Sequence, residues 1–166
     1  MELIILIGLQ ASGKSKFYRT RFAETYEHIS KDLLKSSKNK NKNQKQAERI
    51  EKAFLEQRSV IIDNTNVTVK DRQLLIDIGR RYNATIIGYY FEPDVSGSRR
   101  RNRQREGKAQ VPEQAIFITA HKLEPPSYAE GFDALYYVCI GKDSSSQNLV
   151  WQIEKILNPG IEAYDG

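Results

Sequence analysis

Short apolar runs alternate along the chain with segments in which apolar residues recur every three or four positions. The short runs predict buried strands over residues 2–8, 28–30, 59–63, 84–91 and 134–140. The longer spacing predicts helices over residues 15–25, 44–57, 68–82, 95–104, 111–123 and 146–157. Because strands and helices alternate almost throughout, we expect an α/β fold in which helices cover both faces of a parallel sheet.

The segment 68–82 carries the most detailed local prediction. Thr68 and Asp71 stand three residues apart at its start, which is the spacing of a capping box. Leu74, Leu75 and Ile78 form its expected apolar stripe. We therefore expect this helix to begin at Thr68 and to pack on the sheet through those three side chains.

The composition limits the class of protein. A chain of 166 residues with 39% hydrophobic and 28% charged residues is typical of one soluble globular domain, which we place at 1–166. No apolar segment is long enough to cross a membrane, so we expect no membrane partner. The single cysteine, Cys139, suits a reducing, cytoplasmic setting and is expected in the core, while Trp151 is expected to dock the last helix. The net charge of +5 favours a polyanionic partner.

The first strand runs directly into a glycine-bracketed turn, Gly8-Leu9-Gln10-Ala11-Ser12-Gly13-Lys14-Ser15, which matches the P-loop pattern in full. In such a loop the backbone N–H groups point at phosphate oxygens, the lysine reaches the β- and γ-phosphates, and the serine hydroxyl ligates Mg²⁺. We expect a P-loop NTPase-type three-layer domain that binds ATP or another NTP. The residues expected to hold the nucleotide here are Gly8, Gln10, Ala11, Ser12, Gly13, Lys14, Ser15 and Lys16.

Two carboxylates follow predicted strands and therefore belong to the sheet edge at which the P-loop lies. Asp63 ends the strand 59–63, where a carboxylate can hold the metal directly or through water. Asp32 follows the strand 28–30 and could accept the proton of an attacking hydroxyl, or could instead be a helix N-cap.

The basic segment 98–108 is the fourth candidate. Arg101 and Arg105 are four residues apart and share one helix face, whereas Arg103 points elsewhere. Such a pair could stabilise the charge of a phosphoryl group in transfer, or could be part of a solvated basic helix. The segment 35–46, KSSKNKNKNQKQ, has nothing to bury, so it is either a solvated loop or a basic flap near the acceptor.

The order of these motifs resembles the kinase domain of the polynucleotide kinase family over roughly residues 3–140. The resemblance rests on the P-loop, Lys31-Asp32, Asp63-Asn64-Thr65-Asn66, the run Arg101 to Arg105, Val111-Pro112 and EPPSYAEGF at 124–132. It implies ATP- and Mg²⁺-dependent phosphorylation of the 5′-hydroxyl end of DNA or RNA, with a helical lid that carries Arg101 and Arg105. The substrate-binding residues that it implies are Asp32 as general base, Lys35, Asp63, Thr65, Asn66 and Val111.

The sequence departs from the family pattern in two places. Lys35 stands where the family usually has an arginine, which keeps the charge but loses the bidentate fork. The lid is one residue longer before Val111-Pro112. No DxDGT-type phosphatase signature occurs, so we expect a kinase alone.

Two other functions share the P-loop and stay open. One is a small-molecule kinase acting on a sugar, nucleoside or drug hydroxyl, and the other is a nucleotide-gated regulatory subunit. Neither His28 nor His121 has metal-ligand spacing to a second ligand, so no zinc site is indicated. The oligomeric state is not predicted.

Overall fold

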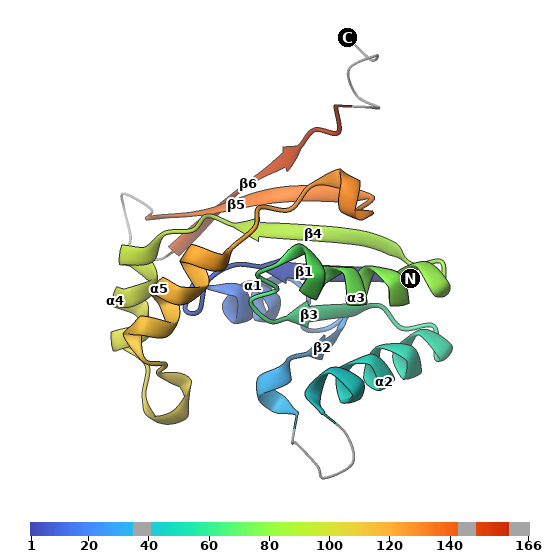
Figure 1. The fold of residues 1–166 in the computed structure, drawn as a ribbon, viewed down its shortest axis with the longest axis horizontal. Helices are drawn as coiled ribbons and strands as arrows, with labels where there is room; N and C mark the ends of the chain where they lie inside the picture. Colours follow the sequence, from blue (N-terminus) through green and yellow to red (C-terminus); the bar gives the residue numbers. More distant parts are fainter. Residues whose placement is uncertain (35–40, 143–148, 160–166) are drawn as a thin grey trace.

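The computed structural model describes residues 1–34, 41–142 and 149–159 (Figure 1). Its strands are β1 (Glu2–Ile7), β2 (Glu27–Ile29), β3 (Val60–Asp63), β4 (Thr85–Phe91), β5 (Ala134–Lys142) and β6 (Leu149–Ile156). Its α-helices are α1 (Lys14–Arg21), α2 (Lys42–Leu55), α3 (Val69–Arg81), α4 (Val95–Arg103) and α5 (Glu113–Lys122). Three short 3₁₀ turns are η1 (Lys31–Leu33), η2 (Gly107–Ala109) and η3 (Tyr128–Glu130).

The strands form one sheet in the order β2-β3-β1-β4-β5-β6. All neighbouring strands are parallel except β5 and β6, which are antiparallel. The predicted α/β class with a largely parallel sheet is therefore confirmed. Parallel strands bring their carboxyl ends to one edge, so the segments that follow β1, β2 and β3 meet there.

The alternation of side chains along β1 explains why helices lie on both faces of the sheet. Leu3, Ile5 and Ile7 belong to a cluster that includes the buried residues of α2 and α3. Ile4 and Leu6 belong to a second cluster, which α1 covers through its buried side chains. In Figure 1, α4 and α5 lie side by side at the left, beyond the arrowhead of β4.

The prediction of a helix over 146–157 is wrong, because the described part of this segment is the strand β6. It pairs with β5 from Leu135 opposite Ile156 to Lys142 opposite Leu149. Val150, Ile153 and Leu157 have helical spacing, but Trp151 and Ile153 also alternate with polar residues. Pairing with the open edge of β5 favours the second pattern. Trp151 packs edge-on against Phe17 of α1, with ring centroids 5.8 Å apart, so it docks a strand rather than a helix.

Smaller differences concern helix ends and single side chains. The capping box of Thr68 and Asp71 is confirmed at the start of α3. Leu74 does not belong to the apolar stripe, since it is 54% exposed and Ile76 is buried instead. Cys139 is half-buried rather than a core residue. The helix α2 begins at Lys42, two residues before the predicted start at residue 44 and inside the segment 35–46, of which residues 35–40 lie outside the described part of the chain.

Candidate functional site

The P-loop joins β1 to α1, and its backbone needs residues that adopt unusual conformations. Gly13 has φ of +94° and Ala11 has φ of +56°. A Cβ atom on Gly13 would lie 3.1 Å from Ile140 Cδ1, and one on Gly8 would lie 2.9 Å from Phe91 Cβ. The two glycines therefore allow the loop to curl tightly against β4 and β5, as the motif predicts.

Lys14 is the first residue of α1, and its buried side chain reaches back into the P-loop. Its Nζ atom donates hydrogen bonds to Gly8 O at 3.0 Å, Leu9 O at 2.6 Å and Ser12 Oγ at 3.2 Å. Burial lowers the pKa of Lys14 to about 8; the charge of Asp63 opposes this shift and the charge of Arg105 adds to it. The ammonium group is thus held where an anionic phosphate would stabilise its charge.

Asp63 connects the P-loop to β2. The Ser15 hydroxyl donates to Asp63 Oδ2 at 2.6 Å, and His28 Nε2 lies 2.8 Å from the same oxygen. The His28 ring in turn stacks on Tyr18, with centroids 4.1 Å apart. Burial raises the pKa of Asp63, but the hydrogen bonds from His28 and Ser15, with the charge of Lys14, outweigh it and lower that pKa overall. Asp63 is therefore ionised at neutral pH.

The Ser15 and Asp63 oxygens fit a magnesium ion. Mg²⁺ in phosphoryl-transfer sites takes one or two protein oxygens and completes its shell with water and substrate phosphates. The described residues hold no cluster of three or more His, Cys, Asp or Glu side chains suited to a metal. A metal at this pair would therefore depend on the nucleotide for its remaining ligands.

Asp32 lies in η1, directly after β2, and it is not a helix cap. The cap is Ser30, whose hydroxyl accepts a hydrogen bond from Asp32 N at 3.3 Å. The Asp32 side chain is exposed. Asn64 holds the segment in place, since its Oδ1 accepts from Lys31 N at 2.8 Å and its Nδ2 donates to Gln46 at 2.7 Å.

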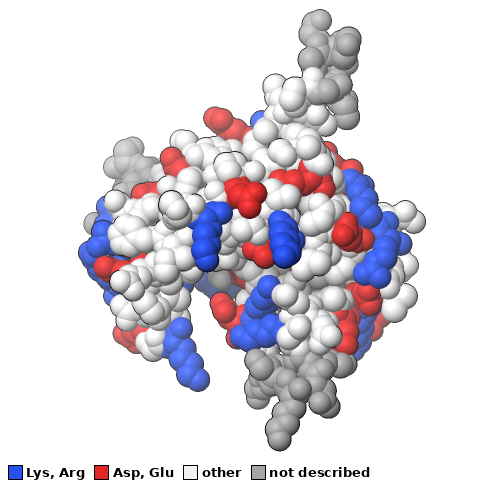
Figure 2. Space-filling model, in the orientation of Figure 1, with Lys and Arg blue, Asp and Glu red and all other residues white. Residues whose placement is uncertain are grey.

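These side chains line one open cleft of about 690 Å³. In Figure 2 a notch separates the lower left lobe from the lower centre of the molecule, with basic side chains on both sides of it. The cleft residues are Gln10, Ala11, Ser12, Lys14, Ser15, Arg19, Ser30, Asp32, Lys42, Asp63, Asn64, Thr65, Arg105, Lys108, Ala109 and Val111. The structure thus places most of the sequence-predicted residues around the same space.

Three cations of the cleft were not among the predicted site residues: Arg19, Lys42 and Lys108. Arg19 follows Ser15 by one helical turn, and that spacing was the available signal. Lys42 is the first residue of α2, so its place depends on where that helix begins. His28 was considered only as a zinc ligand, and its contact with Asp63 needs the pairing of β2 with β3.

The two lid arginines occupy different positions. Arg101 Nε donates to Ala11 O at 2.6 Å, which ties α4 to the P-loop. Burial lowers the pKa of Arg101. Arg105 lies beyond the end of α4 and lines the cleft, so the prediction that it shares a helix face with Arg101 is wrong. Arg103 pairs with Glu113 away from the cleft. Asn102, which the sequence reasoning missed, exchanges two hydrogen bonds with the backbone of Val111, at 2.8 and 3.0 Å.

A few predicted contacts lie elsewhere. Asn66 does not line the cleft: it is buried and its Nδ2 donates to Leu6 O at 2.7 Å, so we no longer propose it as a substrate contact. Thr65 does line the cleft, and its carbonyl accepts from Gly8 N at 3.0 Å. The Lys16 side chain is exposed outside the cleft lining, and Lys35 lies outside the described residues.

Residues 3–126 match the family AAA_33, described as AAA domain. The chain belongs to this family. It is also 32% identical over 135 residues to the bifunctional polynucleotide phosphatase/kinase of Schizosaccharomyces pombe. That alignment covers 79% of this chain and 32% of the relative, so the chain spans about a third of the relative's length. The resemblance to the polynucleotide kinase family is thereby confirmed.

Solved structures show the same fold. A fungal RNA kinase matches with a TM-score of 0.68 and 18% identity, over 89% of this chain and 40% of that one. A gluconokinase from Sinorhizobium meliloti 1021 matches with a TM-score of 0.62 and 16% identity, over 88% and 86% of the two chains. This AAA_33 member thus has the fold of P-loop kinases. Within the described residues, no helix has the length and apolar character needed to cross a membrane.

Proposed function

We propose that this AAA_33 domain is a 5′-hydroxyl polynucleotide kinase that transfers the γ-phosphate of ATP, or another NTP, to the end of DNA or RNA. The observation that supports it best is the position of Asp32. This carboxylate, which caps no helix, lines the same cleft as Lys14 and Ser15. A nucleotide switch needs no such group, whereas a kinase needs one to accept the proton of the acceptor hydroxyl.

The reaction follows from this arrangement. The acceptor oxygen attacks the γ-phosphorus, the bond from that phosphorus to the β–γ bridging oxygen breaks, and Asp32 accepts the hydroxyl proton. The P-loop N–H groups and Lys14 hold the phosphates, and Arg105 meets the charge that develops on the transferring group. Mg²⁺, held by Ser15 and Asp63 when bound, would neutralise phosphate charge.

The cations of the cleft support a polyanionic acceptor. Arg19, Lys42 and Lys108 line the same cleft as Asp32 and Arg105, which is more positive charge than the triphosphate site alone requires. The lid residue Val111 lies on the same cleft and offers an apolar surface for a terminal base. We propose that residues 1–166 act as a single kinase domain in cytoplasmic nucleic acid repair.

The test is an assay with γ-labelled ATP and Mg²⁺. DNA and RNA oligomers with a 5′-hydroxyl are compared with the same oligomers carrying a 5′-phosphate, and with gluconate and nucleosides. We expect label only on the 5′-hydroxyl oligomers. Label on gluconate or a nucleoside alone would replace the proposal by a small-molecule kinase, the class to which the gluconokinase neighbour belongs. No label on any acceptor, with tight ATP binding, would favour a regulatory subunit.

A further inference from the structure

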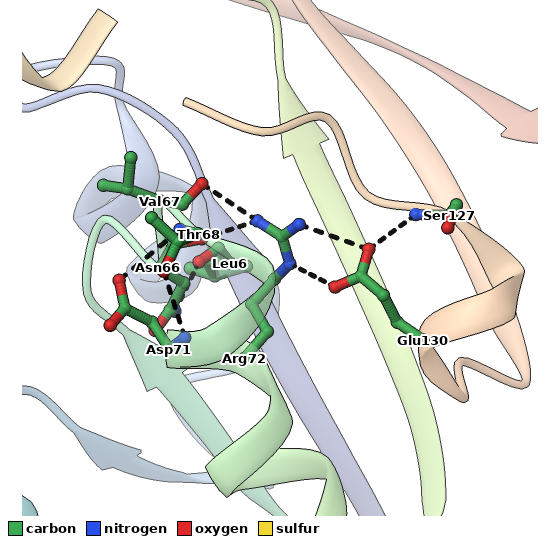
Figure 3. Close-up of polar contacts among 8 residues, drawn as sticks. All are labelled: Leu6, Asn66, Val67, Thr68, Asp71, Arg72, Ser127 and Glu130. Atoms are coloured by element: carbon green, nitrogen blue, oxygen red, sulfur yellow. Dashed lines mark hydrogen bonds and ion pairs between the residues drawn. The ribbon is translucent and has the colours of Figure 1, made fainter. Parts of the chain in front are cut away.

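Arg72 of α3 is a charged residue buried in the middle of the fold, outside the cleft. Its guanidinium donates to Glu130 Oε1 at 2.7 Å and Oε2 at 3.2 Å. Its Nη1 atom also donates to Asn66 O at 2.9 Å and Val67 O at 3.2 Å (Figure 3). The side chains of Arg72 and Glu130 are 0% and 4% exposed.

Stability alone does not explain this pair. Taking two charges out of water is costly, and well-packed apolar residues of similar volume often serve a fold equally well. An apolar pair, however, could not donate hydrogen bonds to the carbonyls of Asn66 and Val67. Those carbonyls belong to a turn in which Asn66 has φ of +48°, a left-handed conformation that needs support from its surroundings.

The turn held by Arg72 is hydrogen-bonded both to the start of the P-loop and to the segment that carries Asp32. Thr65 O accepts from Gly8 N, and Asn66 Nδ2 bonds Leu6 O, so the turn fixes the start of the P-loop. Asn64, the residue before Thr65, accepts a hydrogen bond from Lys31 N through its Oδ1 atom, and Lys31 directly precedes Asp32. A shift of this turn would therefore move the donor site and the proposed base relative to each other.

The segment 124–131 supplies the other side of the contact. Glu130 Oε2 also accepts from Ser127 N at 2.8 Å, which closes the capping box of η3 (Figure 3). Glu124 N donates to Val67 O at 2.9 Å. The segment reaches β6 as well, because the Tyr128 hydroxyl donates to Ile156 O at 2.5 Å. The segment 124–131 thus anchors the turn to β6, which lies at the opposite edge of the sheet from β2.

We propose that Arg72 is a positioning residue for phosphoryl transfer, and that Glu130 keeps its guanidinium in place. Through the turn at 64–67, the pair sets the distance between the P-loop and the segment that carries Asp32. Neither residue touches a substrate. This assignment rests on the proposed kinase function for its activity readout, but the order of the turn can be measured without any acceptor.

The test compares four variants of the full chain: one double variant and the single variants Arg81→Met, Ile76→Val and Arg72→Lys. The double variant Arg72→Met/Glu130→Leu removes both charges and leaves no buried charge alone. Arg81→Met is the matched control, since Arg81 lies on the same helix and its pair with Glu51 is exposed. Ile76→Val, a truncation in the core face of α3, is the control for lowered stability. Each is measured for melting temperature, Gly8 amide exchange, ATP affinity, kcat and acceptor KM.

We expect the double variant to exchange the Gly8 amide at least about tenfold faster and to lose on the order of 10²-fold in kcat, the effect of misplacing reacting groups by about 1 Å. ATP affinity should stay within a few-fold, because Lys14 and the P-loop amides remain. Arg81→Met should match the unchanged protein. Arg72→Lys, which retains the charge but cannot reach Glu130 and both carbonyls together, should fall between them.

Two results would overturn the assignment. The first is that the double variant keeps the Gly8 amide exchange rate and the kcat of the unchanged protein, which would show that apolar residues can replace the pair without loss. The second is that Ile76→Val, at the same melting temperature as the double variant, loses as much kcat. The loss of kcat would then be explained by lowered stability alone. If the unchanged protein phosphorylates no oligomer, the proposed function fails. Gly8 exchange and intrinsic ATP hydrolysis then still decide the role of Arg72.

Discussion

His28 Nε2 lies 2.8 Å from Asp63 Oδ2, the oxygen that also accepts the Ser15 hydroxyl. The two residues are 35 positions apart and come from the neighbouring strands β2 and β3. The histidine thereby orients a carboxylate that faces the P-loop. A partner behind a metal-binding carboxylate affects metal affinity even though it touches no metal.

Replacing His28 by phenylalanine should weaken the response to magnesium. Phenylalanine keeps the stacking on Tyr18 but removes the hydrogen bond that helps lower the pKa of Asp63. We expect the Mg²⁺ concentration for half-maximal activity to rise about 10- to 100-fold. Magnesium titrations at fixed ATP measure this. His121→Phe, on the exposed face of α5, is the control and should change nothing; an unchanged titration in His28→Phe would remove His28 from the site.

The lowered pKa of Lys14 predicts a pH-dependent stability of the nucleotide-free protein. Burial lowers this pKa from 10.5 to about 8. Between these values the unfolded chain holds a proton that the folded chain has lost, so the free energy of unfolding rises with pH there. Below about pH 8 the cost of the buried charge is fully present, and it amounts to roughly 3 kcal/mol.

Denaturant unfolding of the unchanged protein and of Lys14→Met at several pH values isolates this effect. The difference between the two free energies of unfolding should shift in favour of the unchanged protein as pH rises from about 8 to about 10.5. A difference that does not vary with pH would contradict the lowered pKa of Lys14.

Transfer activity of Lys14→Met should fall by about 10²–10³-fold or more, because one preorganised charge contact is lost.

Asp32→Asn should separate catalysis from nucleotide binding. Asparagine keeps the size of the side chain, and the cap of η1 is unaffected because Ser30 provides it. Single-turnover transfer to a 5′-hydroxyl oligomer should fall by about 10²–10⁴-fold, while ATP affinity stays within a few-fold. Transfer at the normal rate would leave the kinase proposal without a base.

Arg105→Ala should lower kcat more than it raises the KM for ATP, because an arginine on the transferring group acts most strongly as charge develops. Arginine fingers contribute about 10³–10⁵-fold, so even a partial role is measurable. Arg101→Ala is the comparison: its bond to Ala11 O supports the P-loop, and we expect mainly a change in the KM for ATP. A pure KM effect in Arg105→Ala would make Arg105 a nucleotide clamp.

Arg19→Gln should weaken the acceptor but not the nucleotide. Arg19 lies one helical turn after Ser15 and lines the cleft that Asp32 also lines. The acceptor KM should rise, and its slope against salt on a double-logarithmic plot should decrease by about 0.7, the value for one phosphate contact on a single strand. Lys16→Gln is the control, since that side chain lies outside the cleft lining. Equal slopes in both variants would exclude a phosphate contact at Arg19.

The sequence was sufficient for the parts of this molecule that depend on local pattern. Buried parallel strands read as continuous apolar runs, and the P-loop and the capping box of Thr68 and Asp71 each lie within a few neighbouring positions. β6 was missed because it is a half-exposed antiparallel edge strand, whose apolar residues fit two periodicities until its partner β5 is known.

The long-range polar contacts could not be predicted in the same way. His28 with Asp63 and Arg72 with Glu130 are 35 and 58 residues apart, and nothing in the local pattern joins them. Asn66 shows the opposite difficulty. It stands in a motif typical of substrate contacts, yet its buried amide serves the backbone of β1.

The 58-residue separation of Arg72 and Glu130 also bears on how the protein folds. A nascent chain that ends before η3 already contains the P-loop, Asp32 and Asp63, but its Arg72 has no carboxylate to meet and would be a buried charge alone. Closing so long a segment is slow compared with forming the local helices. We therefore expect the turn at 64–67 to become ordered only after η3 and β5 are in place, so that a partly synthesised chain carries the P-loop and Asp32 without yet fixing them relative to each other.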